Sequence, residues 1–513
     1  MCAKILVMLT VEEINKTIAE LVETLGEKIL ETAAMPSSGS SRRYFRVKTD
    51  RRFLIGVYNI NIEENDAFFS FSKHFHECKL PVPEILAISS DKEIYIQTDL
   101  GDDTLFSHVE KCLKSGEFDD TTIALYKKSL DKLVDFQMIG HQGLDYSKAF
   151  PTPSFDEMSI MDDLNYFKYC FLKEQEEISF NETRLDVDFQ KLAKYILEAP
   201  SDFFMYRDFQ SRNIMIVDNE PYFIDYQGGR KGPLQYDVVS LLYQVKARIP
   251  EDIKHHLIEY YKDKISRYTS AYGNDVKSLS SRQMRGGTER AIAVESFDAY
   301  FPAFVLLRLL QVLGAYGFRG LIQKKLHFIQ SIPYAIRELI KANEKWDLPF
   351  ELPELQAIIG QFDILLLKYE TIEPKRLTVS VNSFSFKNGG IPPDKSGNGG
   401  GFVFDCRALP NPGRYAKFKK STGEDADVKE FLENEADVHC FLQNVQMIVY
   451  QSIDNYLERG FKNLQINFGC TGGQHRSVYF AQAVGRLIHE NYPMINVEIN
   501  HLAQHISHVY EAR

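Results

Sequence analysis

One segment constrains the fold of this chain more than any other. It starts at residue 206 and reads YRDFQSRNIMIVDNEPYFID. Within it, two short apolar runs, Ile214–Val217 and Tyr222–Ile224, flank four residues that favour a turn, Asp-Asn-Glu-Pro. Apolar runs of this length around such a turn predict a β-hairpin. The hairpin would hold the polar residues at its two ends on neighbouring strands.

Three side chains that carry oxygen stand around this predicted hairpin. Asn213 follows Asp208 by five positions, and Asp225 follows Asn213 by twelve. Mg2+ prefers oxygen ligands on rigid backbone, and phosphoryl transfer needs a group that accepts the proton of the attacking hydroxyl. The spacing is therefore typical of a phosphoryl-transfer site, with Asp208 as the base and with Asn213 and Asp225 as ligands of the Mg2+ that bridges nucleotide phosphates. A solvated turn aspartate is the alternative interpretation of Asp208.

The length of the chain predicts two or three domains, because 513 residues exceed what one hydrophobic core usually covers. Its 44% of hydrophobic residues suffice for a globular protein.

The formal net charge of -11 gives no overall attraction to nucleic acid, so RNA binding is not expected. Seven scattered cysteines without a CxxC spacing argue against a disulfide framework and against a structural zinc site.

The sequence contains no pattern that predicts export or membrane insertion. The N-terminal stretch MCAKILVMLT has too short an apolar core for a secretory signal. No later apolar run approaches the length needed to cross a bilayer. We therefore expect a protein of the reducing cytoplasm.

The residues before the central segment predict a small β-rich lobe. A Ser/Gly turn at Ser37–Ser41 separates a first helix, capped at Thr10, from two β-rich runs, Tyr44–Val47 and Phe53–Tyr58. Two strands joined by such a turn can cover nucleotide phosphates with backbone N–H groups, although a simple loop is equally compatible with the sequence. The second run reads FLIGVY and lacks a lysine, so arginines would have to neutralise the phosphates. The candidate cofactor-binding residues are Ser40, Arg42, Arg43 and Arg46.

Helical periodicity dominates residues 104–200 and 250–344, where Gly and Pro are few. A small β-rich lobe followed by a helical lobe predicts an α+β, two-lobed, kinase-like fold. Asp237, in QYDVVSLLY, would either accept N–H bonds from the catalytic loop or cap its helix, and we assign it a structural role.

The composition shifts after Glu344, where a Pro-rich stretch and one more helical run precede a β-rich end of the chain. We place the kinase-like domain at residues 1–345, a linker with a helix at 346–375, and a separate α/β domain at 376–513.

A second site is predicted in LQINFGCTGGQHRSVYFAQAVGRLI, where an apolar strand enters a glycine-rich turn and a helix opens at Ser477. The N–H groups of such a turn and the helix dipole attract anions, and Arg476 with His475 would clamp phosphate oxygens. Cys470 and Arg476 also have the Cys-x5-Arg spacing of protein tyrosine phosphatases, in which a thiolate attacks phosphorus. Phosphatase activity in this domain and a buried, inert cysteine remain alternatives.

Several motifs together resemble the aminoglycoside/choline-phosphotransferase superfamily over residues 1 to about 345. They are YRDFQSRN, FIDYQ, QYDVVSLLY, SSRRYFRV, PVPEILA, LGDDTL and LQVLGAYGFRGLI. Within the superfamily they are most similar to bacterial anomeric kinases that phosphorylate N-acetylmuramate and N-acetylglucosamine at the 1-hydroxyl. The resemblance implies an ATP-dependent phosphotransferase that acts on an amino-sugar hydroxyl. Tyr206 stands where the family usually has a histidine that braces the loop, so we expect activity to survive this departure.

The motifs SFSFKNG, FDCRALPNP, STGEDADVKEFL and GCTGGQHRSVY closely resemble the C-terminal domain of the RNase adapter RapZ, over residues 376 to about 505. In that family the domain binds glucosamine-6-phosphate. The family's usual P-loop N-terminal domain and its basic, RNA-linked tail are both missing here, so the resemblance implies binding of a hexosamine phosphate but not of RNA. The positions that match the family's binding residues are Asp405, Arg407, Thr471, Gly472, Gly473, His475 and Arg476.

Taken together, the sequence predicts a cytosolic ATP- and Mg2+-dependent kinase for an amino-sugar hydroxyl, with a C-terminal module that binds or senses a hexosamine phosphate. The competing hypothesis is a regulatory protein whose kinase fold serves as a nucleotide-dependent scaffold and whose RapZ-like end controls amino-sugar supply. The missing strand lysine and Tyr206 favour the scaffold, whereas the presence of Asp208, Asn213 and Asp225 together favours the enzyme.

Overall fold

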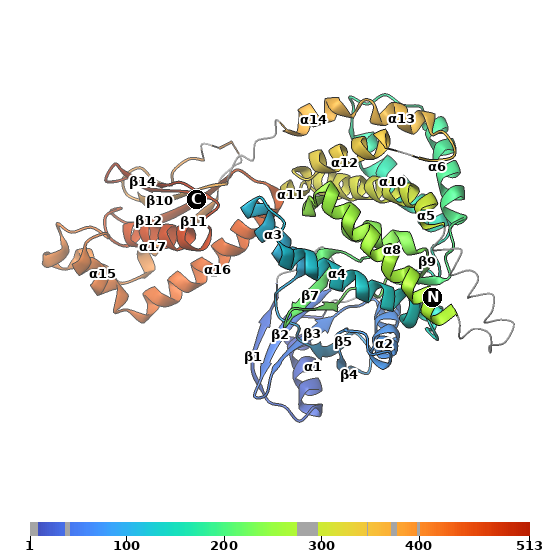
Figure 1. The fold of residues 1–513 in the computed structure, drawn as a ribbon. Coiled ribbons are helices and arrows are strands. Elements are labelled where there is room, and N and C mark those ends of the chain that lie inside the picture. The colour runs from blue at the N-terminus through green and yellow to red at the C-terminus, as the bar shows by residue number, and fades with distance from the viewer. Residues whose placement is uncertain are drawn as a thin grey trace, which may run out of the picture. The chain divides into compact units, whose positions relative to one another are not determined.

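The computed structural model describes residues 9–35, 42–273, 296–345, 347–370, 377–394, 396–397 and 401–512. They form two compact units (Figure 1). The first comprises Met1–Ala315 and Pro333–Leu365, and the second comprises Tyr316–Ile332 and Leu366–Arg513.

A five-stranded antiparallel sheet forms the β-rich lobe of the first unit, in the order β1-β2-β3-β5-β4. The two predicted β-rich runs correspond to β2 and β3, and the prediction missed β1. The strands are β1 (Ile29–Ala34), β2 (Arg43–Thr49), β3 (Phe53–Tyr58), β4 (Ile85–Ile88) and β5 (Ile94–Thr98).

Helices cover both faces of this sheet. The capping box predicted at Thr10 starts α1 (Val11–Thr24), whose buried residues pack on one face. The contact is close, since a Cβ at Gly56 would lie 2.7 Å from Ile18 Cδ1 and would require the end of that side chain to move. On the other face, Phe68 of α2 (Ile62–Glu77) contacts the ring of Tyr95, with 5.4 Å between the ring centroids. The central strands β3 and β5 are therefore packed on both sides, whereas β1 at the edge is mostly exposed.

The helical lobe follows, as its periodicity predicts. Its long helices are α3 (Leu105–Ser115), α4 (Asp120–Asp135), α5 (Glu157–Cys170), α6 (Glu182–Leu197), α7 (Leu234–Leu242), α8 (Glu251–Gly273), α10 (Phe297–Tyr316) and α12 (Ile332–Glu344). The shorter helices α13 (Pro353–Ile359) and α14 (Phe362–Glu370) follow them. Two small antiparallel sheets, β6 (Phe203–Met205) with β9 (Arg230–Gly232) and β7 (Ile214–Val217) with β8 (Glu220–Phe223), carry the central segment.

The predicted hairpin exists, but its turn is shorter than expected. Asp218 and Asn219 alone form it, with φ of 52° and 62°. Two central residues with positive φ make a turn whose twist suits antiparallel strands, and Asp and Asn tolerate that conformation. Pro221, which the sequence placed in the turn, therefore lies in β8 opposite Ile216.

One helical segment is longer and more apolar than expected from the sequence. Phe297–Ile322 is long and apolar enough to cross a membrane, contrary to the prediction that no run approaches that length. In this structure 78% of its most apolar window is buried inside the protein.

The second unit is built on a five-stranded sheet in the order β11-β12-β10-β13-β14. The first four strands in this order are parallel and β14 is antiparallel to β13. Because parallel strands end at the same edge, the residues that follow them gather there. The strands are β10 (Thr378–Ser385), β11 (Phe402–Asp405), β12 (Asn463–Cys470), β13 (Asn496–His501) and β14 (Ile506–Tyr510), and the helices are α15 (Ala426–Glu433), α16 (Ala436–Arg459) and α17 (Arg476–Asn491).

The predicted fold class is thus confirmed. A β-sheet lobe and a helical lobe make a kinase-like domain, and a separate α/β domain follows in the chain.

Candidate active site

The three residues predicted to carry phosphoryl transfer converge at the base of the hairpin. Asn213 Nδ2 donates hydrogen bonds to the main-chain oxygen of Asp208 (2.9 Å) and to Asp225 Oδ2 (3.2 Å). Across the hairpin, Ile224 N donates to Asn213 O at 3.1 Å, which holds the two ends together. The structure therefore brings all three residues into one cluster.

The electrostatics of this cluster fit a divalent cation. Burial raises the pKa of Asp225, and the charge of Asp208 raises it further. Asp225 also has a φ of 71°, a conformation that residues other than glycine rarely adopt and that tends to persist at functional sites. Two carboxylates that repel each other, beside an amide oxygen, form a donor set suited to Mg2+. Asn213 and Asp225 are placed to hold such an ion.

Arg42 brings a buried positive charge to this cluster. Its side chain is 5% exposed, and its Nη1 lies 3.6 Å from Asp225 Oδ1. Its Nη2 lies 2.8 Å from an oxygen of Glu64 near the start of α2. Kinases commonly pair a strand lysine with a helix glutamate to position phosphates. Arg42 comes just before β2 and forms a similar pair with Glu64 of α2, so a positive charge lies beside Asp225 although β3 contains no lysine.

The other candidate cofactor-binding residues are not brought to this cluster. Arg43 Nη1 donates to Leu9 O at 3.2 Å. Arg46 pairs with Asp99 at 2.7 Å and with Asp102 at 2.8 Å, just after β5. Among the described contacts of the three predicted arginines, only those of Arg42 include Asp225. Ser40 lies outside the described residues.

Asp237 supports the loop that carries Asp208. It is fully buried and accepts backbone N–H bonds from Tyr206 (2.7 Å) and Arg207 (2.9 Å). Burial raises its pKa to about 7, although these two bonds act in the opposite direction. The Tyr206 hydroxyl donates to Ile224 O at 2.7 Å, so the tyrosine braces the loop against the end of the hairpin. This agrees with the predicted structural role of Asp237.

A buried ion pair also supports the loop. The two terminal nitrogens of Arg207 donate to the two oxygens of Asp163, at 2.8 and 2.7 Å. The side chains of the pair are 18% and 8% exposed. Arg207 Nη1 also donates to the hydroxyl of Tyr236 at 2.6 Å. Because the pair joins α5 to the residue before Asp208, it sets the position of the proposed base.

In the second unit, the predicted anion turn lies between β12 and α17. Gly473 adopts a φ of 67°, and a Cβ there would lie 2.8 Å from the Cβ of Ala503, so only glycine fits. Thr471 and Gly472 are exposed, and nothing lies within 4 Å of the position of a Cβ at Gly472. The outer side of the turn is therefore open to a ligand.

The charged residues of this site surround the turn. Arg407 pairs with Asp405 at 2.6 Å and lowers the pKa of that carboxyl. Arg476 is 4% exposed, and its Nη1 donates to the main-chain oxygens of Arg407 (2.9 Å) and Leu409 (2.8 Å). His475 Nε2 lies 2.8 Å from the main-chain oxygen of Phe418. All the predicted residues are close in the fold, but these contacts use part of their hydrogen-bonding capacity.

One nitrogen of the Arg476 side chain lacks a hydrogen-bond acceptor among the described residues. Its Nε is buried and has no hydrogen-bond partner among the residues that the structure describes. A buried polar group without a partner costs free energy, and an anion at the turn would supply the acceptor.

Cys470 lies under the turn. Burial by itself would raise its pKa, but the hydroxyl of Ser477 and the backbone N–H groups of Ser477, Gly473 and Gln474 outweigh burial and lower it. The Ser477 hydroxyl lies 3.1 Å from the sulfur. The turn thus stabilises a negative charge at its base, which is what the phosphatase alternative requires.

Comparison with known families bears on both units. Residues 32–271 match the model of the phosphotransferase enzyme family, and residues 377–505 match the model of the RapZ C-terminal domain. The chain joins a phosphotransferase-family domain to a RapZ C-terminal domain. Both resemblances seen in the sequence are therefore confirmed at the level of the family.

Curated relatives share only part of this organisation. A nucleotide-binding protein of Methylococcus capsulatus is 39% identical over 120 residues, which are 23% of this chain and 39% of the relative. Another, from Pseudoalteromonas translucida, is 42% identical over 131 residues, which are 25% of this chain and 43% of the relative. The chain thus spans about two fifths of the length of these relatives.

Among solved structures, amicoumacin kinase hAmiN, in complex with AMP-PNP, Ca2+ and Ami, aligns over 68% of this chain and 97% of its own. The TM-score is 0.44 at 10% identity. A similarity this low carries no weight for function.

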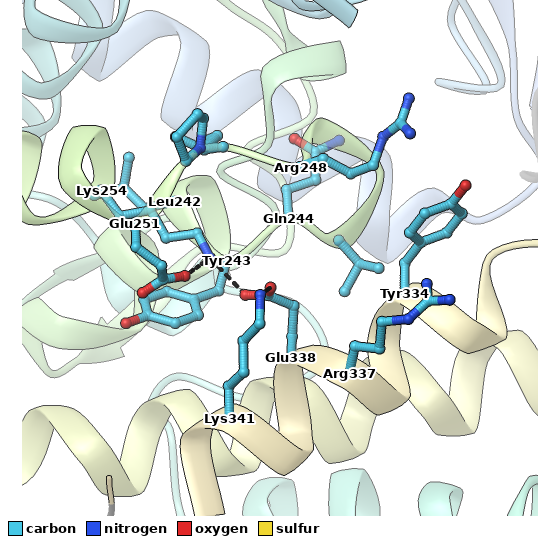
Figure 2. Close-up of a pocket in the computed structure, with 13 residues that line it drawn as sticks. Leu242, Tyr243, Gln244, Arg248, Glu251, Lys254, Tyr334, Arg337, Glu338 and Lys341 are labelled. Atoms are coloured by element: carbon cyan, nitrogen blue, oxygen red, sulfur yellow. Dashed lines mark hydrogen bonds and ion pairs between the residues drawn. The ribbon is translucent and has the colours of Figure 1, made fainter. Parts of the chain in front are cut away.

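A cavity of about 250 Å3 lies in the phosphotransferase domain between the α7–α8 region and α12 (Figure 2). Lys254 crosses it and pairs with Glu251 and Glu338. Gln244, on its wall, accepts hydrogen bonds from the backbone N–H and the hydroxyl of Ser211. None of the three clustered residues lines this cavity. Through Gln244 it adjoins the loop that carries Asp208 and Asn213, but it is not the proposed transfer site.

Proposed function

We propose that this chain is a cytoplasmic, ATP-dependent phosphotransferase that transfers the terminal phosphoryl group to a hydroxyl of an amino sugar. The observation that carries the proposal is the convergence of Asp208, Asn213 and Asp225 beside the Arg42–Glu64 pair. A scaffold that only binds nucleotide has no need of a base next to two metal ligands. The similarity of the sequence motifs to N-acetylmuramate and N-acetylglucosamine kinases favours those sugars, with the anomeric hydroxyl as acceptor.

The residues divide the work of the reaction between them. Asp208 orients the acceptor hydroxyl and takes its proton as the oxygen attacks the terminal phosphorus and the bond from that phosphorus to the ADP oxygen breaks. Asn213 and Asp225 would hold Mg2+, which neutralises the charge of the phosphates when bound. Arg42 adds a second positive charge, and Glu64 fixes its direction. Catalysis of this kind consists mostly of positioning and charge stabilisation.

The direct test is ATP consumption by the purified protein with N-acetylmuramate, N-acetylglucosamine and glucosamine in turn. We expect one sugar to be phosphorylated in a Mg2+-dependent reaction. ATP binding without turnover on any of these sugars would support the scaffold hypothesis instead.

Replacing Arg42 with Met is expected to raise the KM for ATP about tenfold or more. The reason is that a charge-assisted contact to phosphate contributes about 1.5–3 kcal/mol. Arg43→Met is the matched control, because Arg43 is the next residue and its side chain contacts Leu9 O. Steady-state kinetics with varied ATP measure both variants. Equal effects of the two substitutions would contradict the role of Arg42.

We further propose that the RapZ-like domain binds a hexosamine phosphate at the turn 471–476. The open turn and the unsatisfied Nε of the buried Arg476 support this proposal. The phosphate would lie above the turn, and the sugar would reach Asp405 and Arg407 at the end of β11.

Arg476→Ala is expected to weaken the binding of glucosamine-6-phosphate to the full chain about tenfold or more, since it removes charge-assisted hydrogen bonds. Calorimetric titration measures the affinity. Arg486→Ala is the control, because Arg486 is an exposed arginine of the same helix. Unchanged binding in the Arg476 variant would remove this residue from the site.

A second candidate activity for the RapZ-like domain is phosphate-ester hydrolysis, which the lowered pKa of Cys470 favours. Against it, Nη1 of Arg476 is directed to two main-chain oxygens. Hydrolysis of p-nitrophenyl phosphate that is lost in Cys470→Ser would establish it, and the absence of hydrolysis by the unmodified protein would exclude it.

A further inference from the structure

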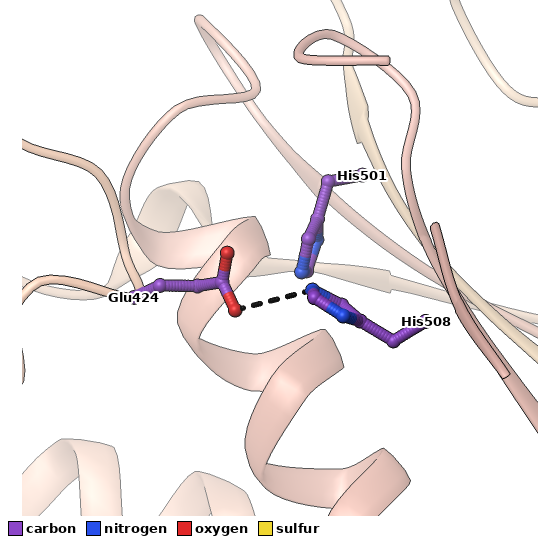
Figure 3. Close-up of side chains that lie close together, drawn as sticks. All are labelled: Glu424, His501 and His508. Atoms are coloured by element: carbon purple, nitrogen blue, oxygen red, sulfur yellow. Dashed lines mark ion pairs between the residues drawn. The ribbon is translucent and has the colours of Figure 1, made fainter. Parts of the chain in front are cut away.

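Three side chains with metal-binding atoms meet in the RapZ-like domain, outside the residues assigned above. They are Glu424, His501 and His508, and one ligand atom of each lies within 4.8 Å of the others. His508 Nε2 is 3.5 Å from Glu424 Oε1. The two imidazole rings are 6.0 Å apart between centroids. Figure 3 shows the three side chains pointing toward one another from separate segments of the chain.

The β13–β14 hairpin brings the two histidines together. His501 pairs with Ile506, and Ile499 pairs with His508. Residues 499 and 501 share a face of the sheet, and so do cross-strand partners, which puts His501 and His508 on the same face as diagonal neighbours. Diagonal neighbours are within reach of each other when their side chains are long or aromatic.

The glycine turn brings Glu424 to the histidines. Gly423 N donates to Gln474 O at 2.9 Å, and a Cβ at Gly423 would lie 2.2 Å from His475 O. Glycine is therefore needed at 423, and it presses the segment before α15 onto the start of α17. The next residue, Glu424, then faces the hairpin.

The environment of His501 suits a metal ligand. Its ring is fully buried, and Nδ1 lies 3.0 Å from Ser383 Oγ, which fixes the orientation of the ring as outer partners of metal-bound histidines do. Nε2 has one long contact, 3.3 Å from Gln482 Oε1.

The other two side chains, Glu424 and His508, are partly exposed to solvent. The side chains of Glu424 and His508 are 28% and 39% exposed. His508 Nε2 is itself buried and has no hydrogen-bond partner among the described residues, its contact with Glu424 being longer than a good hydrogen bond. A divalent ion between them would satisfy this nitrogen.

We propose that Glu424, His501 and His508 bind a Zn2+ ion through one carboxylate oxygen and one nitrogen of each ring. Two imidazoles and a carboxylate with a fourth position open to solvent form an established zinc ligand set. Imidazole nitrogen prefers Zn2+ to Mg2+ or Ca2+, so this ion is distinct from the Mg2+ expected in the phosphotransferase domain. The cysteine spacing could not reveal the site, because its ligands are histidines and a glutamate from distant segments.

The test is a Zn2+ titration of the full chain, freed of metal, against a chromophoric chelator. Excess Mg2+ is present to fill the oxygen-ligand site. We expect one Zn2+ per chain. His508→Ala and Glu424→Gln should each weaken binding about 100-fold or more, since the loss of even an outer partner commonly costs 10–100-fold. Both residues are partly exposed, so the metal-free variants should melt at the temperature of the metal-free parent.

His505→Asn is the matched control. His505 is an exposed histidine of the same hairpin with a φ of 58°, a conformation that Asn readily adopts. Its affinity for Zn2+ should equal that of the parent. The proposal is overturned if the parent binds no Zn2+, if the two ligand variants bind it as tightly as the parent, or if His505→Asn loses as much affinity as they do.

Discussion

Replacing Asp208 with Asn is expected to lower kcat for phosphoryl transfer by about 100- to 10,000-fold, the usual contribution of a positioned general base. Binding of ATP should be almost unchanged, because Asn213 contacts the main-chain oxygen of residue 208 and the side chain is not needed for that bond. Single-turnover kinetics and a nucleotide-binding titration measure the two effects separately.

Two further variants make this result specific. Asp225→Asn should weaken the binding of Mg-ATP as well as turnover, because it removes a charged ligand of the ion. Asp218→Asn is the matched control, since Asp218 is the exposed turn residue of the same hairpin and Asn tolerates its φ of 52°. Full activity in the Asp208 variant would end the assignment of the base.

Replacing Arg207 with Met is expected to lower the free energy of unfolding of the phosphotransferase domain by about 3–5 kcal/mol. The substitution leaves the buried carboxylate of Asp163 without its partner, which is costly in a medium of low polarity. Denaturant unfolding followed by the fluorescence of the chain's tyrosines measures the change.

A double variant separates the lost pair from other effects. When Asp163→Leu accompanies Arg207→Met, the charge without a partner disappears, so much of the stability should return. Lys173→Met is the control, because Lys173 and Glu182 form an ion pair at 2.8 Å with side chains 40% and 44% exposed. Such surface pairs contribute about 1 kcal/mol or less. A double variant as unstable as the single one would show that packing of Arg207, and not its charge, matters.

The parts of the site that were predictable depend on short stretches of chain. The hairpin follows from two apolar runs and a turn, and it alone determines that Asn213 and Asp225 are neighbours. Only the length of its turn was predicted wrongly. The prediction placed Pro221 in the turn because Pro is common in turns, but Asp218 and Asn219 adopt positive φ and form the turn by themselves.

The partners of these residues were not predictable in the same way. Glu64 is one of many acidic residues near a helix start, and nothing in its local sequence indicates that Arg42 will meet it. Arg43 and Arg46 were equally plausible candidates. Side chains alternate between the two faces of a strand, so the sequence predicts which face a residue lies on but not which residue it contacts there. Local sequence patterns do not predict such pairs, because the two residues are far apart in the chain.

The sequence by itself thus determined the cluster of Asp208, Asn213 and Asp225 and the glycine turn, because each depends on spacing within about twenty residues, and its motifs indicated the two kinds of domain by resemblance. Tertiary structure alone decided which arginine reaches Asp225, what holds Arg476, and that Glu424 meets two histidines some eighty residues further along. These contacts depend on how strands pair and helices pack, and packing brings together residues whose separation in the chain carries no signal.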